Sequence, residues 1–197
     1  MAAPKITLYF SPGSSSMAVQ IALREAKAPF EAKALGFGEK GTRQPWYLAI
    51  NPAGKVPALV IDGKLLNEVA GCLWYLAKRY PDAGLLPAND PQTEAQAVSW
   101  MSFLASTVHP ARPKGLEALT EAWVLAEKKL GDGEWALGSW SIVDIHLFRL
   151  YWRMINSPGD RPTGLPRLDA HYKRMMARPA VQETIEAEKA VGYDLPR

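Results

Sequence analysis

Cysteine is almost absent from this chain, since Cys72 is the only one among 197 residues. One cysteine excludes an intrachain disulfide, a CxxC redox pair and a cysteine-rich zinc site. Histidine is nearly as scarce, because His109, His146 and His171 lie far apart and no HExxH motif occurs. We therefore expect no metal ion and no dithiol chemistry, and we expect Cys72 to pack inside a helix.

Long apolar runs and runs of one charge are also missing. No segment approaches the roughly 20 apolar residues of a membrane span, and the first residues lack a secretory hydrophobic segment. The 23 Lys and Arg exceed the 20 Asp and Glu by only 3 and are scattered, which gives nucleic-acid binding little support but suits small anionic ligands. With 48% hydrophobic and 22% charged residues, we expect a globular, cytoplasmic protein with neither a membrane nor a nucleic-acid partner.

The first eighty residues alternate between strand and helix patterns, so we expect a mixed sheet with helices packed on it. Asp62-Gly63 between two short apolar runs is a strong hairpin signal. Strands are predicted over residues 6–10, 30–34, 57–61 and 64–66, helices over 16–27, 46–50 and 68–80, and a mobile glycine-rich loop over 35–45.

Strand patterns end near residue 80, where Pro81, Pro87 and Pro91 mark a linker. Helical periodicity dominates the remainder. We therefore predict an α/β domain over 1–80, a linker over 81–91 and an all-helical domain over 92–197. Helices are predicted over 93–108, 115–130, 141–154, 165–177 and 181–189.

The helix predicted over residues 141–154 begins with a recognisable capping motif. Ser141 and Asp144 have the spacing of a capping box, in which a hydroxyl and a carboxylate satisfy backbone N–H groups at the helix start. The residues that follow are apolar on most sides, so we expect a buried central helix.

The most informative segment runs from Asn51 to Val60 and contains Pro57 just before an apolar strand. Proline seldom enters a strand interior because it cannot donate a ladder hydrogen bond. The cis form of an X-Pro bond costs only about 0.5–1 kcal/mol. A cis Val56-Pro57 bond would turn the backbone of Val56 towards solvent, where an extended peptide can pair with it. The alternative is a trans proline that only trims an edge strand.

These features together resemble the cytosolic glutathione transferases, most closely the bacterial beta class. The similarity runs from about Ile6 to Glu188 and is carried by the turn Phe10-Ser11-Pro12-Gly13-Ser14-Ser15-Ser16, by Ile21-Ala22-Leu23-Arg24-Glu25, by Val56-Pro57 with Glu68, by Trp100-Met101-Ser102-Phe103-Leu104-Ala105-Ser106-Thr107-Val108-His109 and by Ser141-Ile142-Val143-Asp144. The resemblance implies an α/β thioredoxin-like N-terminal domain and an all-α C-terminal domain.

The chain departs from the family pattern in three places. Ser15 stands where the beta class has its cysteine, which makes the site similar to serine-type transferases. Val69 follows Glu68 where many relatives have serine, which removes a hydrogen bond worth about 1–2 kcal/mol. Only thirty-one residues separate His109 from Ser141, so we expect a shortened fifth helix and do not predict the form of the second-substrate pocket.

The resemblance implies that the protein activates the thiol of glutathione, whose free pKa is near ~8.5. Lowering that pKa by roughly two units requires the N-terminus of the first helix, worth up to about 2 kcal/mol, and a hydroxyl donor, worth about 1.5–3 kcal/mol. Ser15 is the expected donor, and Tyr9 is its rival. Alternatively Ser14, Ser15 and Ser16 only start the helix.

The resemblance also implies which residues bind the remaining groups of glutathione, which is a tripeptide. Val56, exposed by Pro57, is expected to pair with the cysteinyl unit, and Glu68 with the α-ammonium group. The N–H of Val69 is expected to receive the α-carboxylate. Lys40 is a candidate for the glycyl carboxylate or a plain solvated lysine.

His109 is expected on the second-substrate side, near Ser102 and Ser106, with a structural role as the alternative. The implied function is transfer of the glutathione thiolate to a small apolar electrophile bound between the domains, in detoxification, by a homodimer formed through the third and fourth helices. Two alternatives remain: a glutathione-dependent lyase, dehalogenase or isomerase, and a noncatalytic ligand-binding or scaffold protein.

Overall fold

The computed structural model describes residues 3–36, 38–87 and 90–195. Its four-stranded sheet has the order β2-β1-β3-β4. Strand β1 pairs in parallel with β2 and antiparallel with β3, which pairs antiparallel with β4. The predicted mixed sheet is therefore confirmed, with strands β1 (Ile6–Phe10), β2 (Glu31–Ala34), β3 (Ala58–Ile61) and β4 (Lys64–Asn67).

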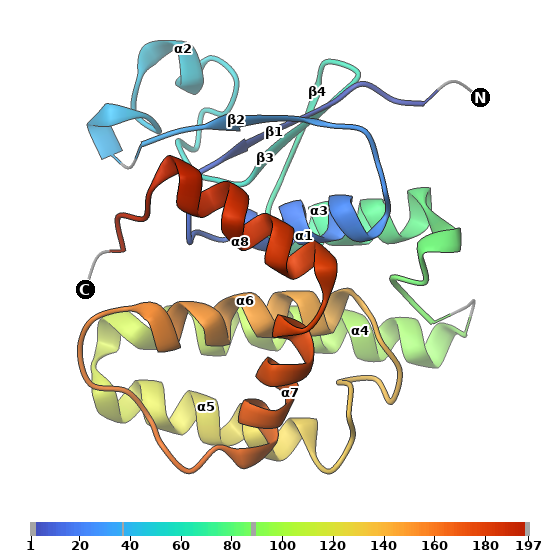
Figure 1. Cartoon of the computed structure of the whole chain (residues 1–197), viewed down its shortest axis with the longest axis vertical. Helices are drawn as coiled ribbons and strands as arrows, with labels where there is room; N and C mark the ends of the chain where they lie inside the picture. The colour runs from blue at the N-terminus through green and yellow to red at the C-terminus, as the bar shows by residue number, and fades with distance from the viewer. Residues whose placement is uncertain (1–2, 37, 88–89, 196–197) are drawn as a thin grey trace.

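Helices cover both faces of the sheet. Helices α1 (Ser16–Glu25) and α3 (Val69–Arg79) lie together on one face, whereas the short α2 (Pro45–Leu48) lies on the other (Figure 1). The predicted loop contains one 3₁₀ turn, η1 (Gly38–Lys40); residue 37 lies outside the described residues. Cys72 is buried in α3, as predicted, and burial raises the pKa of its thiol to about 12.

The segment before β3 has the predicted backbone. The Val56-Pro57 peptide bond is cis, and the strand begins at Ala58, one residue later than predicted. Asp62 and Gly63 have φ values of 48° and 82°, the left-handed pair that a two-residue hairpin turn requires. The predicted hairpin is therefore confirmed.

The second half of the chain is helical, but its first helix differs from the prediction. Helix α4 (Pro91–Phe103) begins inside the predicted linker because the Asp90 side chain accepts hydrogen bonds from the N–H groups of Gln92 and Thr93. It ends before residue 108, and a π-helical turn, η3 (Leu104–Val108), and a 3₁₀ segment, η4 (His109–Lys114), continue it. A 3₁₀ turn, η2 (Pro81–Ala83), lies at the start of that linker.

The remaining helices are α5 (Leu116–Leu130), α6 (Ile142–Asn156), α7 (Pro166–Met176) and α8 (Pro179–Val191). Helix α6 is the predicted buried helix, and its apolar side chains join those of α1 and α3 in one core. Helix α8 returns from the helical bundle to lie along α1 (Figure 1). The described residues include no helix with the length and apolarity needed to cross a membrane.

The predicted capping box at the start of α6 is present. Asp144 is fully buried, and its carboxylate accepts hydrogen bonds from the N–H groups of Ser141 and Ala136, both at 2.9 Å. A ring nitrogen of His171 lies 3.1 Å from the same carboxylate. One side chain therefore joins the start of α6, the preceding loop and α7.

We predict that Asp144→Ala lowers the free energy of unfolding by about 3 kcal/mol, because it leaves several buried donors without an acceptor. Urea unfolding of wild type and variant measures this difference. Asp82→Ala, which removes an exposed carboxylate, is the matched control and is expected to change the value by less than about 0.5 kcal/mol. Equal losses in the two variants would contradict the assigned role of Asp144.

Candidate functional site

The serine turn, residues 11–16, joins β1 to α1. The Ser14 and Ser16 hydroxyl oxygens lie 2.6 Å apart, and Ser16 Oγ donates to the Ser11 carbonyl at 3.2 Å. The Ser14 hydroxyl also accepts from the Ser16 N–H at 3.2 Å. Ser15 precedes the first residue of α1, and no capping hydrogen bond to its hydroxyl is found in the described part of the chain. Ser14 and Ser16 thus shape the helix start, whereas Ser15 leaves its hydroxyl available to a ligand.

A cavity of about 900 Å³ lies beside this turn, between the sheet part and the helical part. Gly13, Ser14 and Ser15 form one edge, and Lys55 and Val56 lie next to the cis proline. Residues of η3, η4, α5 and α6 also line the cavity. The structure thus brings together three residues that the sequence predicted: Ser15, Val56 and His109.

Val56 lines this cavity and directly precedes the cis proline. Neither its N–H nor its C=O takes part in a hydrogen bond within residues 3–36, 38–87 and 90–195. Both groups lie just before β3, where an extended ligand could add to the sheet. The position suits the predicted pairing with a peptide.

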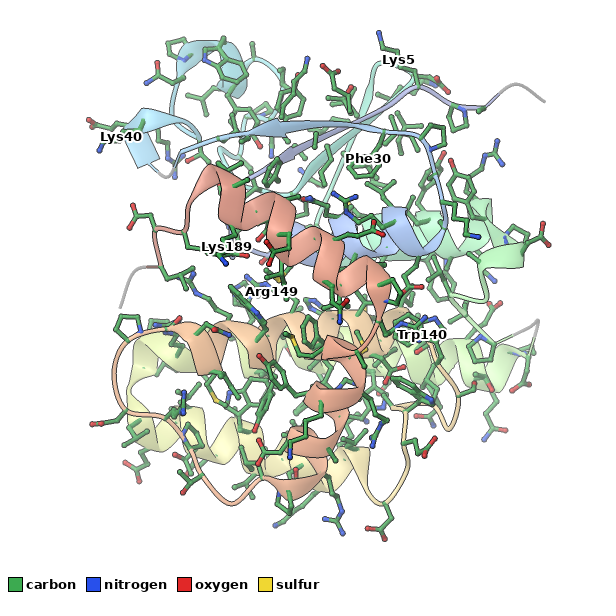
Figure 2. All side chains as sticks on the ribbon, in the orientation of Figure 1. Lys5, Phe30, Lys40, Trp140, Arg149 and Lys189 are labelled. Carbon is green, nitrogen blue, oxygen red and sulfur yellow. The ribbon has the colours of Figure 1, made fainter. Side chains whose placement is uncertain are left out.

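Two arginines that sequence reasoning missed lie in the cavity wall. Arg149 is only 4% exposed, and its Nε donates to the Ser14 carbonyl at 3.0 Å. Arg153 lies one turn further along α6 and donates to the Gly13 carbonyl at 3.4 Å. Figure 2 shows Arg149 between α6 and the overlying helices. The sequence feature that could have revealed these two arginines is a pair of positive charges, four residues apart, on a mostly apolar helix.

A third side chain holds the serine turn from α8. Glu188 is fully buried, and its carboxylate accepts a hydrogen bond of 2.7 Å from the Gly13 N–H. Burial raises its pKa to about 8, although this hydrogen bond and the charge of Arg149 oppose the rise. We call Arg149, Arg153 and Glu188 the clasp. Through it, two helices of the second half fix the turn that presents Ser15.

Gly13 suits this arrangement for two reasons. Its φ of 70° lies in the left-handed region, which glycine adopts without steric cost. A Cβ at this position would also clash with the Leu195 side chain. The C-terminal segment therefore packs directly over the turn.

His109 lies at the start of η4 and lines the cavity. Partial burial, and then the positive charge of Arg149, lowers its pKa to about 4. Lys55 and Arg153 act in the same direction. The imidazole is therefore neutral at physiological pH and can donate or accept a hydrogen bond but carries no charge.

Helix α5 completes the cavity on the side expected for a second substrate. It runs for 15 residues, as many as α6, and places Leu116, Leu119 and Trp123 in the wall. The short interval between His109 and Ser141 therefore does not prevent α5 from forming this wall.

Several predicted residues lie outside the residues that line the cavity. The Tyr9 ring packs against Tyr47 and Trp46, with centroid distances of 5.7 and 6.3 Å. Lys40 is exposed in η1, at the outer edge of the sheet part and far from Arg149 (Figure 2). Ser102 and Ser106 are also exposed, and the Ser106 hydroxyl donates to the Ser102 carbonyl at 2.8 Å.

Glu68 and Val69 form a separate feature at the start of α3. Glu68 is exposed, with φ 62° and ψ 128°, a combination that costs a non-glycine residue roughly 1–3 kcal/mol and is concentrated at functional sites. Val69 is buried, and its N–H belongs to the first turn of α3, where N–H groups suit an anion. The described residues contain no group of His, Cys, Asp and Glu side chains arranged to hold a metal ion.

Known proteins are similar to this chain in sequence and in fold. The family described as "Glutathione S-transferase, N-terminal domain" matches residues 13–79, from the serine turn to the end of α3. The chain is 31% identical to glutathione S-transferase GstA of Escherichia coli O157:H7, over 92% of this chain and 98% of that protein. It is 33% identical to the maleylacetoacetate isomerase of Rhizobium meliloti strain 1021, over 76% of this chain and 71% of that protein.

A solved structure shows the same architecture. The sphingomonad glutathione S-transferase complexed with glutathione superposes with a TM-score of 0.81 at 31% identity, over 93% of this chain and 98% of that chain. The predicted thioredoxin-like sheet followed by a helical half is therefore the observed fold.

The pKa of Glu188 leads to a prediction about stability. Because this pKa is about 8 in the folded protein against an ordinary 4.5, the folded state keeps a proton that the unfolded chain releases. The free energy of unfolding should therefore fall as pH rises from about 5 to about 8. Glu188→Gln keeps an acceptor for the Gly13 N–H but cannot titrate, so it should gain at least about 1 kcal/mol on wild type across this range.

Urea unfolding at several pH values measures this gain. Glu186→Gln changes an exposed glutamate two residues away on the same helix and should follow wild type at every pH. If the free energy of unfolding depends on pH in the same way for wild type and Glu188→Gln, Glu188 does not hold a proton in the folded state.

Proposed function

Since this chain belongs to the glutathione S-transferase family, we propose that it binds glutathione beside the serine turn and transfers its thiolate to a small electrophile with an apolar body. The main support is the position of Ser15, at the start of α1 and at the edge of the cavity, with its hydroxyl outside the hydrogen bonds that shape the turn. A hydroxyl donor and a helix N-terminus both stabilise a thiolate.

The tripeptide is proposed to lie across the edge formed by Val56 and the start of α3. The Val56 backbone pairs with the cysteinyl unit, Glu68 meets the α-ammonium group, and the Val69 N–H meets the α-carboxylate. The unusual backbone of Glu68 supports this assignment. Lys40 lies outside the cavity lining, so binding of the glycyl carboxylate by Lys40 requires the loop to move.

His109 is proposed to act on the second substrate as a neutral hydrogen-bonding group. Its place in the wall of the same cavity as Ser15 and its lowered pKa support this role. Catalysis then consists of thiolate stabilisation and of holding the two reactants close together.

Ser15→Ala is expected to lower kcat/KM for glutathione with 1-chloro-2,4-dinitrobenzene at least about tenfold near pH 6.5, because one hydrogen bond to the thiolate is lost. The loss should shrink towards pH 9, where the free thiol ionises unaided. Steady-state kinetics across this range measures both effects.

Two further variants make this test specific. Ser99→Ala removes an exposed hydroxyl on α4 and is expected to retain wild-type kinetics. Tyr9→Phe decides between the two candidate donors. A fall in kcat/KM with Tyr9→Phe and none with Ser15→Ala would identify Tyr9 as the donor to the thiolate. Binding of glutathione without turnover of any electrophile would favour a ligand-binding protein.

Isomerisation is a second candidate, supported by the similarity to the maleylacetoacetate isomerase of Rhizobium meliloti. An isomerase regenerates glutathione in each cycle, whereas a transferase consumes it. Incubation with maleylacetoacetate and a small amount of glutathione separates the two: conversion of many equivalents of substrate per glutathione would establish isomerisation.

We also propose a homodimer formed through α3 and α4. Val98 on α4 is 51% exposed, which suits an apolar contact with a second copy. Sedimentation equilibrium should give twice the 21.7 kDa chain mass, and Val98→Glu should shift the equilibrium towards monomer. A wild-type monomer at micromolar concentration would refute the dimer.

A further inference from the structure

Two buried polar side chains hold the turn that precedes Val56. Tyr47 belongs to α2 and is fully buried, and its hydroxyl donates to the Lys55 carbonyl at 2.6 Å. Asn51 is 1% exposed, and its side-chain amide donates to the same carbonyl at 2.8 Å. A carbonyl oxygen has two acceptor lone pairs, so these two donors occupy the Lys55 carbonyl. We call Tyr47 and Asn51 the carbonyl clamp.

Both members of the carbonyl clamp are fixed by their own surroundings. The Asn51 side-chain oxygen accepts from the Ala53 N–H at 3.2 Å, and the Asn51 N–H donates to the Tyr47 carbonyl at 2.8 Å. The Tyr47 ring packs in an apolar cluster with Tyr9 and Leu35. Burial raises the pKa of the Tyr47 hydroxyl above its ordinary 10, although the hydrogen bond with Asn51 opposes the rise. The hydroxyl therefore keeps its proton at physiological pH and remains a donor.

The carbonyl clamp determines the direction of the Val56 N–H. The Lys55 carbonyl and the Val56 N–H belong to one peptide unit, which is trans, because among the described residues the cis bond is that of Val56-Pro57. In a planar trans peptide the C=O and the N–H point in opposite directions. Val56 lines the cavity, whereas Tyr47 and Asn51 lie outside its described lining. The hydrogen bonds that draw the carbonyl towards the clamp therefore turn the N–H away from it, to the cavity side.

The Val56 N–H is available to a ligand, because it has no hydrogen-bond partner in the part of the chain that the structure describes. Backbone donors need an acceptor when water is excluded. Under the proposed function, that acceptor is the cysteinyl carbonyl of glutathione, which adds to the sheet as an extended peptide. A donor that is already aimed binds more tightly, since less conformational freedom is lost on binding.

We propose that Tyr47 and Asn51 are positioning residues for glutathione, which hold the Lys55 carbonyl and so aim the Val56 N–H at the cysteinyl carbonyl. This inference rests on the proposed function, since it explains how the same site recognises the peptide. Neither side chain contacts the ligand in this account. The alternative is that the clamp only satisfies buried polar groups and closes the turn, without affecting recognition of this carbonyl.

The test compares two ligands that differ at one peptide unit. S-methylglutathione has the cysteinyl carbonyl. An analogue with a trans carbon–carbon double bond in place of the cysteinyl–glycyl amide has nearly the same shape but lacks the carbonyl and the glycyl N–H. Calorimetry gives a dissociation constant for each ligand, and the ratio of the two is the preference for the amide. The wild-type protein is expected to bind S-methylglutathione at least about tenfold more tightly, because the analogue leaves the Val56 N–H unpaired.

Tyr47→Phe removes one donor to the Lys55 carbonyl and keeps the ring in its apolar cluster. It is expected to reduce the preference at least about threefold, and Tyr47→Phe combined with Asn51→Ala is expected to reduce it to about twofold or less. Tyr80→Phe is the matched control, because the Tyr80 hydroxyl is buried without a hydrogen-bond partner among the described residues and lies outside the cavity lining. It should keep the wild-type preference. Urea unfolding curves are measured for all three variants.

Two results would overturn the inference. The first is a wild-type protein that binds both ligands equally. The second is an equal loss of affinity for both ligands in the folded double variant, with the preference unchanged, which would show that the clamp only closes the turn. If the double variant does not fold, Tyr47→Phe alone decides, and a wild-type preference in this variant contradicts the positioning role.

Failure of the proposed function gives a different pattern. If S-methylglutathione does not bind to the wild-type protein, glutathione binding at this site is refuted, and the positioning role is refuted with it. If it binds to the wild type and every variant keeps the same preference, only the positioning role is refuted.

Discussion

The hydrogen bond from the Gly13 N–H to the buried carboxylate of Glu188 connects the beginning of the chain to its end. Arg149 and Arg153 hold the carbonyl groups of Ser14 and Gly13 in the same turn. The serine turn is therefore held by residues from outside the sheet part of the chain. Since a small misplacement of a reacting group is costly to catalysis, the packing of α6 and α8 is part of the site.

The same packing determines the character of the cavity. Helix α6 is held at its start by the buried Asp144 and presents Arg149 and Arg153 towards the serine turn. Helix α5 closes the other side with apolar side chains. Under the proposed function, a thiolate at the start of α1 would lie in the same cavity as the neutral His109 and the apolar side chains of α5.

Local signals explain which features were predictable from the sequence. The Asp62-Gly63 hairpin, the cis Val56-Pro57 bond and the Ser141 capping box depend on a few neighbouring residues, and the structure has all three. Helix α4 begins before the predicted residue 93 because Asp90, which the prediction placed in the linker, caps it. The clasp could not be predicted, since Glu188 meets a backbone group 175 residues away. The resemblance aligned Tyr9 with a functional tyrosine, but β1 directs its ring towards Trp46 and Tyr47.

Ultraviolet titration of glutathione bound to the wild-type protein tests the central claim most directly, because it follows the thiolate itself. If the start of α1 and the Ser15 hydroxyl stabilise the thiolate, its absorbance should appear with a midpoint about two pH units below the ~8.5 of the free thiol. A midpoint equal to that of free glutathione, with binding demonstrated by calorimetry, would contradict thiolate activation at this site.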